Sequence, residues 1–204
     1  MITLIDYGGS NMRSVQKAFE HLDVPLQVAT TADEIGRAEK LVLPGVGAFG
    51  AGMDALRRRD MEAAIRDRVD QGRPLLGICL GMQFLFESSQ EMGQHAGLGL
   101  LAGDVVRFPA DGPKIPHMGW NQLEHAGDHP LLQGVPSGSY TYFVHSYYCR
   151  PADESTIIAR TDYGLRFAAI AGRDNIYGIQ FHPEKSQHVG LTILRNFSNL
   201  GGLS

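Results

Sequence analysis

The chain has 204 residues with a net charge of −4 at pH 7, and 43% of its residues are hydrophobic. This size and composition are typical of one soluble globular domain, so we predict a single domain over residues 1–204. The acidic balance and the absence of a basic stripe argue against a nucleic-acid partner. Two cysteines, no apolar run long enough to span a membrane and no signal peptide together favour a cytoplasmic protein.

Strand and helix patterns alternate through the first half of the chain. Short apolar runs typical of buried strands lie at 2–5, 26–29, 41–43 and 75–78. Helical segments lie around 15–22, 31–38, 51–58 and 61–71. Because continuous apolar strands separated by helices are typical of parallel sheets, we predict an α/β fold. Its sheet is open, doubly wound and mostly parallel, with helices on both faces.

The second half has a different pattern, with strand-like segments joined by short turns. These segments lie at 105–108, 119–124, 140–149, 156–160, 167–171 and 176–181. We predict that they form antiparallel hairpins added to the main sheet. A last helix is expected to begin at Ser186.

Cys79 ends an apolar run, with Gly77 and Gly81 two positions away on either side and an apolar helical run, 84–86, just beyond. This layout is typical of a nucleophile elbow with cysteine in place of serine. The glycines allow the chain to pass close to itself, and the N-terminus of the following helix favours a thiolate. An isolated cysteine is more often a small buried apolar residue, and we expect that structural role for Cys149.

A cysteine nucleophile needs a base, and His182 with Glu184 supplies one far downstream. Pro183 disfavours helical geometry at His182, so we predict an extended segment in which both side chains point to the same side. Glu184 would then hold the imidazole with its other nitrogen toward the sulfur. The elbow and this motif together predict a Cys79, His182, Glu184 triad.

The glycine-rich segment 44–50 follows a predicted parallel strand. It is either an ordinary turn between strand and helix or one half of an oxyanion hole. We favour the oxyanion hole, with N–H donors from Leu80 and from Val46 or Gly47. The turn at 8–11 matches no phosphate-binding motif, and the eight histidines lack metal-ligand spacing, so we predict neither cofactor nor metal.

The segments 77–83 and 181–184 resemble the elbow and base motifs of the glutamine amidotransferases with a Cys-His-Glu triad. The resemblance spans nearly the whole chain. Three further segments, 43–50, 114–121 and 142–148, are most similar to glutaminase subunits of imidazole glycerol phosphate synthase, an enzyme of histidine biosynthesis.

This resemblance implies hydrolysis of glutamine to glutamate and ammonia. The residues that it places around the substrate are Gln83, Glu91, Ser146 and Tyr147. A carboxylate and polar donors suit the charged α-amino and α-carboxylate groups of glutamine. The structural alternatives are a surface amide of a helix for Gln83, a loop carboxylate for Glu91, and polar residues of a strand for Ser146 and Tyr147.

The resemblance also implies a partner, because ammonia must reach a second active site before water protonates it. The implied partner is a (β/α)8-barrel cyclase subunit in a heterodimer that channels ammonia. The residues expected on the docking side are Asn11, Met118, Trp120, Tyr142 and Lys185. A resting oxyanion loop that the partner activates is a further hypothesis from the resemblance.

Three other functions remain open from the sequence. The chain could be the glutaminase of another synthase, such as one making anthranilate or pyridoxal phosphate. It could be a non-catalytic regulatory subunit with the same fold, although an intact triad argues against that role. A plain cysteine hydrolase of other amides would turn over without a partner.

Overall fold

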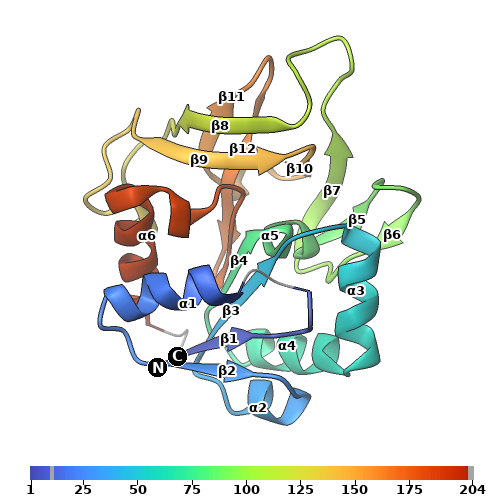
Figure 1. Cartoon of the computed structure of the whole chain (residues 1–204), viewed down its shortest axis with the longest axis vertical. Coiled ribbons are helices and arrows are strands. Elements are labelled where there is room, and N and C mark those ends of the chain that lie inside the picture. Colours follow the sequence, from blue (N-terminus) through green and yellow to red (C-terminus); the bar gives the residue numbers. More distant parts are fainter. Residues whose placement is uncertain (10–11, 202–204) are drawn as a thin grey trace.

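The computed structural model describes residues 1–9 and 12–201, and a seven-stranded sheet forms its centre (Figure 1). The strand order is β11-β12-β13-β4-β3-β1-β2, in which β13, β4, β3, β1 and β2 run parallel and β12 and β11 are added antiparallel. The strands are β1 (Ile2–Ile5), β2 (Leu26–Ala29), β3 (Lys40–Gly45), β4 (Leu75–Cys79), β11 (Ile157–Asp162), β12 (Arg166–Arg173) and β13 (Ile176–Ile179). The predicted mostly parallel sheet is confirmed.

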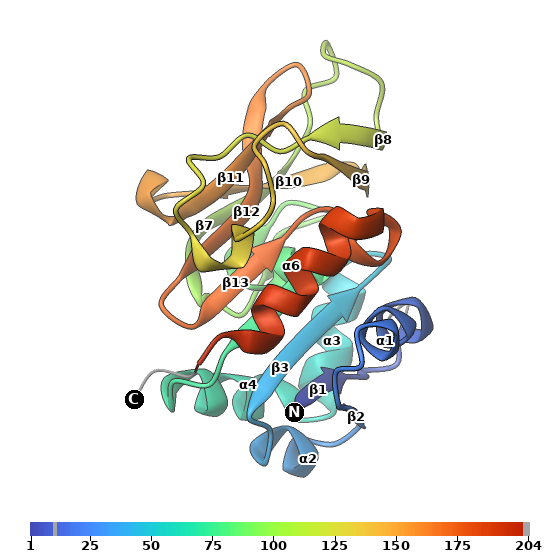
Figure 2. The ribbon, with the colours of Figure 1, turned by 90° about the vertical axis from the view of Figure 1, so that its left-hand side faces the viewer.

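Helices cover both faces of this sheet. On one face lie α1 (Met12–His21) and α6 (Gln187–Asn199), which pack against each other; Figure 2 shows α6 in front of the sheet, running alongside β3. The other face carries α2 (Ala32–Gly36), α3 (Phe49–Arg58) and α4 (Met61–Asp70). Two separate apolar cores result, one under each helix layer, so the doubly wound arrangement is also confirmed.

The start of α2 shows how local sequence sets these boundaries. The Thr31 side chain accepts from the Glu34 N–H at 3.3 Å, and the Glu34 carboxylate accepts from the Thr31 N–H at 3.1 Å. Such a capping box satisfies two backbone donors that the first turn of a helix leaves free. The segment therefore turns into a helix where the sequence predicted one.

Two small sheets lie beside the carboxyl ends of the central strands. One has the order β10-β7-β5-β6 and the other is the hairpin β8-β9, which crosses above the central strands in Figure 1. Their strands are β5 (Phe86–Ser89), β6 (His95–Ala96), β7 (Leu101–Arg107), β8 (His117–Gln122), β9 (Tyr140–His145) and β10 (Tyr147–Pro151). Single 3-10 turns are η1 (Pro130–Leu132), η2 (Glu154–Thr156) and η3 (Pro183–Lys185).

Two predictions about these strands were wrong. The expected single strand over 140–149 breaks at Ser146, because β9 pairs with β8 whereas β10 pairs with β7. The Ser146 carbonyl accepts from the Phe108 N–H at 3.1 Å where the chain changes sheets. The apolar run 84–86 does not continue a helix: α5 (Leu80–Phe84) is short, and Phe86 begins β5, which pairs with Leu101 of β7. A short apolar run alone does not distinguish a helix from a strand.

Candidate active site

Cys79 sits at the sharp turn between β4 and α5, at the carboxyl end of the central strand β4. Its backbone has φ 55° and ψ −110°, a conformation that few residues other than glycine adopt. Gly77 makes the turn possible, since a Cβ there would lie 2.5 Å from the carbonyl oxygen of Gly81. The predicted elbow is present, with its cysteine held in a strained conformation typical of functional sites.

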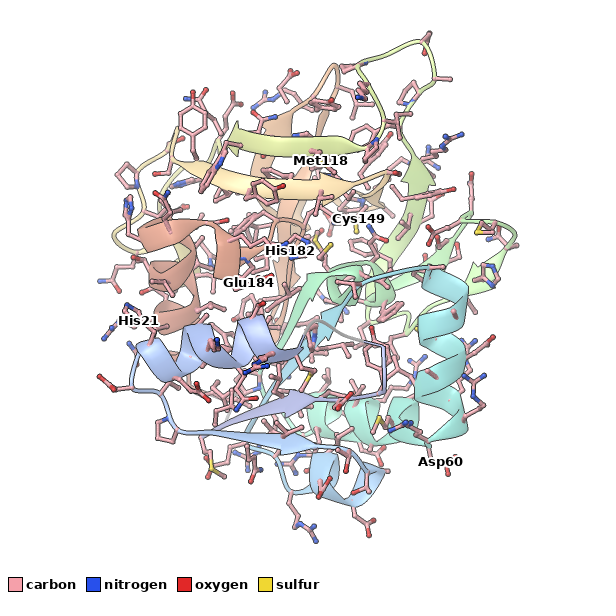
Figure 3. All side chains as sticks on the ribbon, in the orientation of Figure 1. His21, Asp60, Met118, Cys149, His182 and Glu184 are labelled. Carbon is pink, nitrogen blue, oxygen red and sulfur yellow. The ribbon has the colours of Figure 1, made fainter. Side chains whose placement is uncertain are left out.

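His182 follows β13, the neighbour of β4 in the central sheet, and three contacts fix its position. Its N–H donates to the Tyr142 carbonyl at 2.9 Å, and its own carbonyl accepts from the Ser186 hydroxyl at 2.6 Å. Its Nδ1 lies 2.9 Å from Oε1 of Glu184. Figure 3 shows the His182 and Glu184 side chains below the β8–β9 hairpin.

The electrostatics of His182 depend on both neighbours. Burial alone would lower the pKa of this imidazole. Hydrogen bonds and charge from Cys79 and Glu184 outweigh burial and raise the pKa to about 10. The structure therefore brings the sulfur and the carboxylate to the same ring, which favours its protonated form at neutral pH.

The local geometry of this motif differs from the prediction. His182 is extended as expected, with φ −94° and ψ 100°, but Glu184 lies within the 3-10 turn η3. Pro183 restricts the residue before it to extended backbone and is itself suited to the first position of a helix. The carboxylate thus reaches the ring from a turn, and its side chain is only 1% exposed.

A pocket of about 380 Å³ opens at Cys79. It brings together most of the side chains that the sequence singled out. The predicted residues that line it are Val46, Gly47, Cys79, Leu80, Gln83, Glu91, Ser146, Tyr147, His182 and Lys185. Pro116, Val144 and His145 also line it, and sequence reasoning assigned them no role at the site.

The loop after β3 forms one wall of this pocket. Val46 is 43% exposed, and Gly47 has φ +94°, a backbone conformation that favours glycine. At the far end of the loop, the Phe49 N–H donates to the Glu91 carboxylate at 2.6 Å. Glu91 therefore borders the pocket and at the same time fixes the start of α3.

Two buried glutamines connect the opposite wall to the sulfur. The Gln83 amide is buried, not a surface group of a helix, and donates to the Tyr147 carbonyl at 3.1 Å and to Oε1 of Gln180 at 3.2 Å. Nε2 of Gln180 lies 3.9 Å from the Cys79 sulfur. Gln180 was missed because only its position one residue beyond β13, beside the elbow, distinguishes it from other glutamines.

Of the described residues expected on a docking side, Lys185 lines the pocket, whereas Met118, Trp120 and Tyr142 do not. Met118 and Trp120 on β8 are 62% and 46% exposed, and Figure 3 shows Met118 on the hairpin above His182. The Lys185 ammonium lies 5.8 Å from the Tyr142 ring centre. Asn11 lies outside the described residues.

Three further features of the described residues concern Cys149, possible metal ligands and the apolarity of the helices. Cys149 is 1% exposed in the core, and burial raises its thiol pKa well above the ordinary value, as expected for a structural residue. Within residues 1–9 and 12–201, no three His, Cys, Asp or Glu side chains group as metal ligands. Over the same residues, no helix has the length and apolarity needed to cross a bilayer.

The protein is thus an α/β protein whose mostly parallel sheet carries a cysteine elbow at the end of β4 and a histidine and a glutamate after the adjacent strand β13. The family described as glutamine amidotransferase class-I matches residues 3–199. The chain therefore belongs to the class-I glutamine amidotransferase family.

Relatives place the chain more narrowly, with the HisH branch of this family. It is 50% identical to imidazole glycerol phosphate synthase subunit HisH of Syntrophotalea carbinolica, over 98% of this chain and 100% of the relative. It is 48% identical to the same subunit of Bacillus subtilis, over 98% and 96% of the two chains.

Solved structures agree with the fold. A crystal structure titled glutamine amidotransferase matches with a TM-score of 0.77 at 20% identity, covering 98% of this chain and 100% of the other. The structure of PurLQS from Thermotoga maritima matches with a TM-score of 0.75 at 19% identity, covering 97% of each chain.

Proposed function

We propose that Cys79, His182 and Glu184 hydrolyse the side-chain amide of glutamine, and that the ammonia passes to a cyclase subunit making imidazole glycerol phosphate in histidine biosynthesis. The observation that carries this proposal is the meeting of three distant segments at one pocket. Nδ1 of His182 lies 2.9 Å from Oε1 of Glu184, and its interactions with Cys79 and Glu184 raise the pKa of the His182 ring to about 10.

The reaction proceeds in two halves. The Cys79 thiolate attacks the amide carbon, and the His182 imidazolium gives its proton to the leaving nitrogen as the C–N bond breaks. This step releases ammonia and leaves a glutamyl thioester. Water then attacks the thioester carbon and gives a proton to His182, and breakage of the C–S bond releases glutamate and restores the thiolate.

Backbone N–H groups stabilise the negative oxygen that forms in each half. Leu80, next to the nucleophile, supplies one donor, and the loop at Val46 and Gly47 supplies the other. In the free subunit this loop rests with its donor turned away, and docking of the partner turns it inward.

The polar groups of the pocket bind the rest of the substrate. The Glu91 carboxylate pairs with the α-ammonium group of glutamine, and Gln83, Ser146 and Tyr147 hold its polar atoms. All four line the pocket beside Cys79. No cofactor or metal takes part, and residues 1–204 act as a single cytoplasmic domain.

The partner is a (β/α)8-barrel cyclase that binds as a heterodimer at the hairpin face. Met118 and Trp120 are large apolar side chains left exposed there, with Tyr142 and Lys185 beside them. The relatives' name describes a synthase subunit, which supports a second chain as the site of ammonia use.

The test compares Cys79→Ala with Cys149→Ala in the complex with the cyclase subunit and its phosphorylated ribulosyl-amino substrate. Cys79→Ala should abolish ammonia release from glutamine, whereas synthesis from added ammonia continues. Cys149→Ala removes the other thiol and should retain activity with glutamine. Glutamine hydrolysis by Cys79→Ala at the unmodified rate would exclude the proposed nucleophile.

A further inference from the structure

Two buried histidines connect the β8–β9 hairpin to the pocket. His117 and His145 face each other across the hairpin, and Nδ1 of His117 lies 3.0 Å from Nε2 of His145. Nδ1 of His145 lies 2.8 Å from the Tyr147 carbonyl oxygen. At the other end, Nδ2 of Asn121 lies 3.2 Å from Nε2 of His117.

These contacts form a chain of hydrogen bonds from Asn121 to Tyr147. Its Asn121 end has a fixed orientation. The Asn121 Oδ1 accepts from the Gln122 N–H at 2.8 Å, and its Nδ2 donates to the Asp162 carbonyl at 2.8 Å. Exchange of the amide nitrogen and oxygen would break both bonds. The atom facing His117 is therefore a donor, and Nε2 of His117 must accept.

The Tyr147 end fixes the opposite partner. A carbonyl oxygen only accepts, so Nδ1 of His145 must donate to it. The two remaining atoms, Nδ1 of His117 and Nε2 of His145, share one hydrogen bond. Since Nε2 of His117 carries no proton, its Nδ1 does, and Nε2 of His145 accepts. Both rings are thus neutral Nδ1–H tautomers, and every donor in the chain points toward Tyr147.

The surroundings of the pair suit neutral rings. His117 and His145 are 2% and 6% exposed. The His117 ring stacks on Phe143 and Tyr163 at centroid distances of 4.7 and 4.0 Å. Burial lowers the pKa of His117 to about 4 and that of His145 to about 3, so both are uncharged at neutral pH.

The chain of hydrogen bonds ends at the wall of the pocket. The Tyr147 carbonyl accepts two hydrogen bonds, one from His145 and one from the Gln83 amide, which together occupy both of its lone pairs. These two donors hold the bend between β9 and β10, where Ser146 and Tyr147 line the pocket. The bond to the Tyr147 carbonyl also orients the Gln83 amide. The second N–H of this amide donates to Gln180, and its oxygen is left for another partner.

We propose that His117 and His145 are positioning residues for glutamine binding. Through the Tyr147 carbonyl they hold the Gln83 amide and residues 146–147 of the pocket wall in the positions that bind glutamine. They touch neither the reacting amide nor the sulfur in this role. The inference rests on the proposed glutamine site and adds residues that act behind it.

The first test is steady-state hydrolysis of glutamine by the complex with the cyclase subunit. His145→Leu removes both hydrogen bonds at similar size and should raise the KM for glutamine about tenfold or more, with kcat changed by less than about threefold. His145→Asn places an amide donor where Nδ1 lies and should restore KM to within about threefold. His129→Leu removes a half-buried histidine that caps η1 outside the pocket, and should leave KM unchanged.

An unchanged KM in a folded His145→Leu protein, while the unmodified complex is active, would overturn the inference. A complex without any glutamine hydrolysis would instead contradict the proposed function. If His145→Leu does not fold, His117→Leu breaks the chain one bond further from the pocket and should raise KM with kcat nearly unchanged.

The second test does not depend on activity. Long-range nitrogen–proton NMR spectra of the free subunit at pH 7 should show His117 and His145 as neutral rings protonated at Nδ1. A ring protonated at Nε2, or a charged ring at either position, would contradict the fixed direction of the chain.

Discussion

Gly81 faces the carbonyl oxygen of Leu43 so closely that a Cβ at residue 81 would overlap that oxygen. Gly81 lies in α5, just after the elbow, and Leu43 lies in β3. The backbone of the elbow helix thus rests directly on the neighbouring strand. This contact sets the height of Cys79 above the edge of the sheet.

Gly81→Ala should therefore damage both folding and activity. The backbone oxygen cannot move aside without breaking β3 pairing, so we expect destabilisation on the order of 3 kcal/mol and loss of glutamine hydrolysis. Urea unfolding and an ammonia-release assay measure the two effects. Gly36→Ala is the matched control, because a Cβ there meets nothing within 4 Å, and it should lower neither stability nor activity.

The elbow itself was predictable, although its contact with Leu43 was not, because the signals for the elbow lie within a few residues of Cys79. Glycines on both sides of Cys79 indicated the elbow, and the pattern over 31–38 indicated a helix where α2 lies. The pre-proline position of His182 likewise predicted its extended backbone. In each case residues a few positions apart determine the geometry.

The parts that sequence reasoning missed depend on residues far apart in the chain. The break at Ser146 follows from a change of sheet, and the role of Gln180 follows from Cys79 lying 101 positions earlier. The His117–His145 pair likewise forms only when β8 meets β9. No periodicity or spacing within one segment encodes these contacts, so only the assembled fold reveals them.

Glu184→Gln tests the orienting role of the buried carboxylate. An amide at this position can offer an N–H to Nδ1 of His182 and so stabilise the wrong tautomer. We expect kcat for glutamine hydrolysis in the complex to fall about 10²- to 10⁴-fold, with little change in overall fold. Glu154→Gln, at a glutamate 79% exposed on its side chain, is the control and should remain active.

The pH dependence of the same variant follows from the charge on His182. The pKa of this imidazole is raised to about 10, so its proton-donating form persists at neutral pH and disappears as the pH rises through about 10. The alkaline fall in kcat/KM should lie in that region for the unmodified enzyme. Because Glu184 contributes to the raised pKa, Glu184→Gln should move the fall to lower pH. An alkaline fall that stays in place would show that the carboxylate does not act on His182.

The free energy of unfolding at acid pH should depend on the two neutral histidines, His117 and His145. Their pKa values lie near 4 and 3 in the folded chain, below the ordinary value of 6.5, so the unfolded chain binds more protons between these limits. The free energy of unfolding should therefore fall as pH drops from 7 to 5, by about 1.4 kcal/mol per pH unit for each proton taken up.

His145→Asn removes one of the two groups that take up these protons on unfolding. Urea midpoints measured at pH 7 and pH 5 should differ less in this variant than in the unmodified chain. His129 also has a pKa lowered by burial, but it is present in both proteins and cancels in the comparison. His21→Asn, at an exposed histidine, should preserve the full difference. Equal differences in all three proteins would contradict the uncharged state of His145.

Trp120 tests the proposed docking face. Its ring meets Tyr142 edge-on at 5.9 Å and remains 46% exposed, so it offers a large rigid apolar surface. Trp120→Ala should weaken binding to the cyclase subunit about 10- to 100-fold, as expected for a tryptophan at the centre of an interface. Isothermal titration calorimetry with the purified cyclase measures this change. Val28→Ala, on edge strand β2 at the opposite end of the molecule in Figure 1, should not alter affinity. Equal affinities for both variants would place the docking face away from the hairpin, because removal of the Trp120 ring would then have cost no contact with the cyclase subunit.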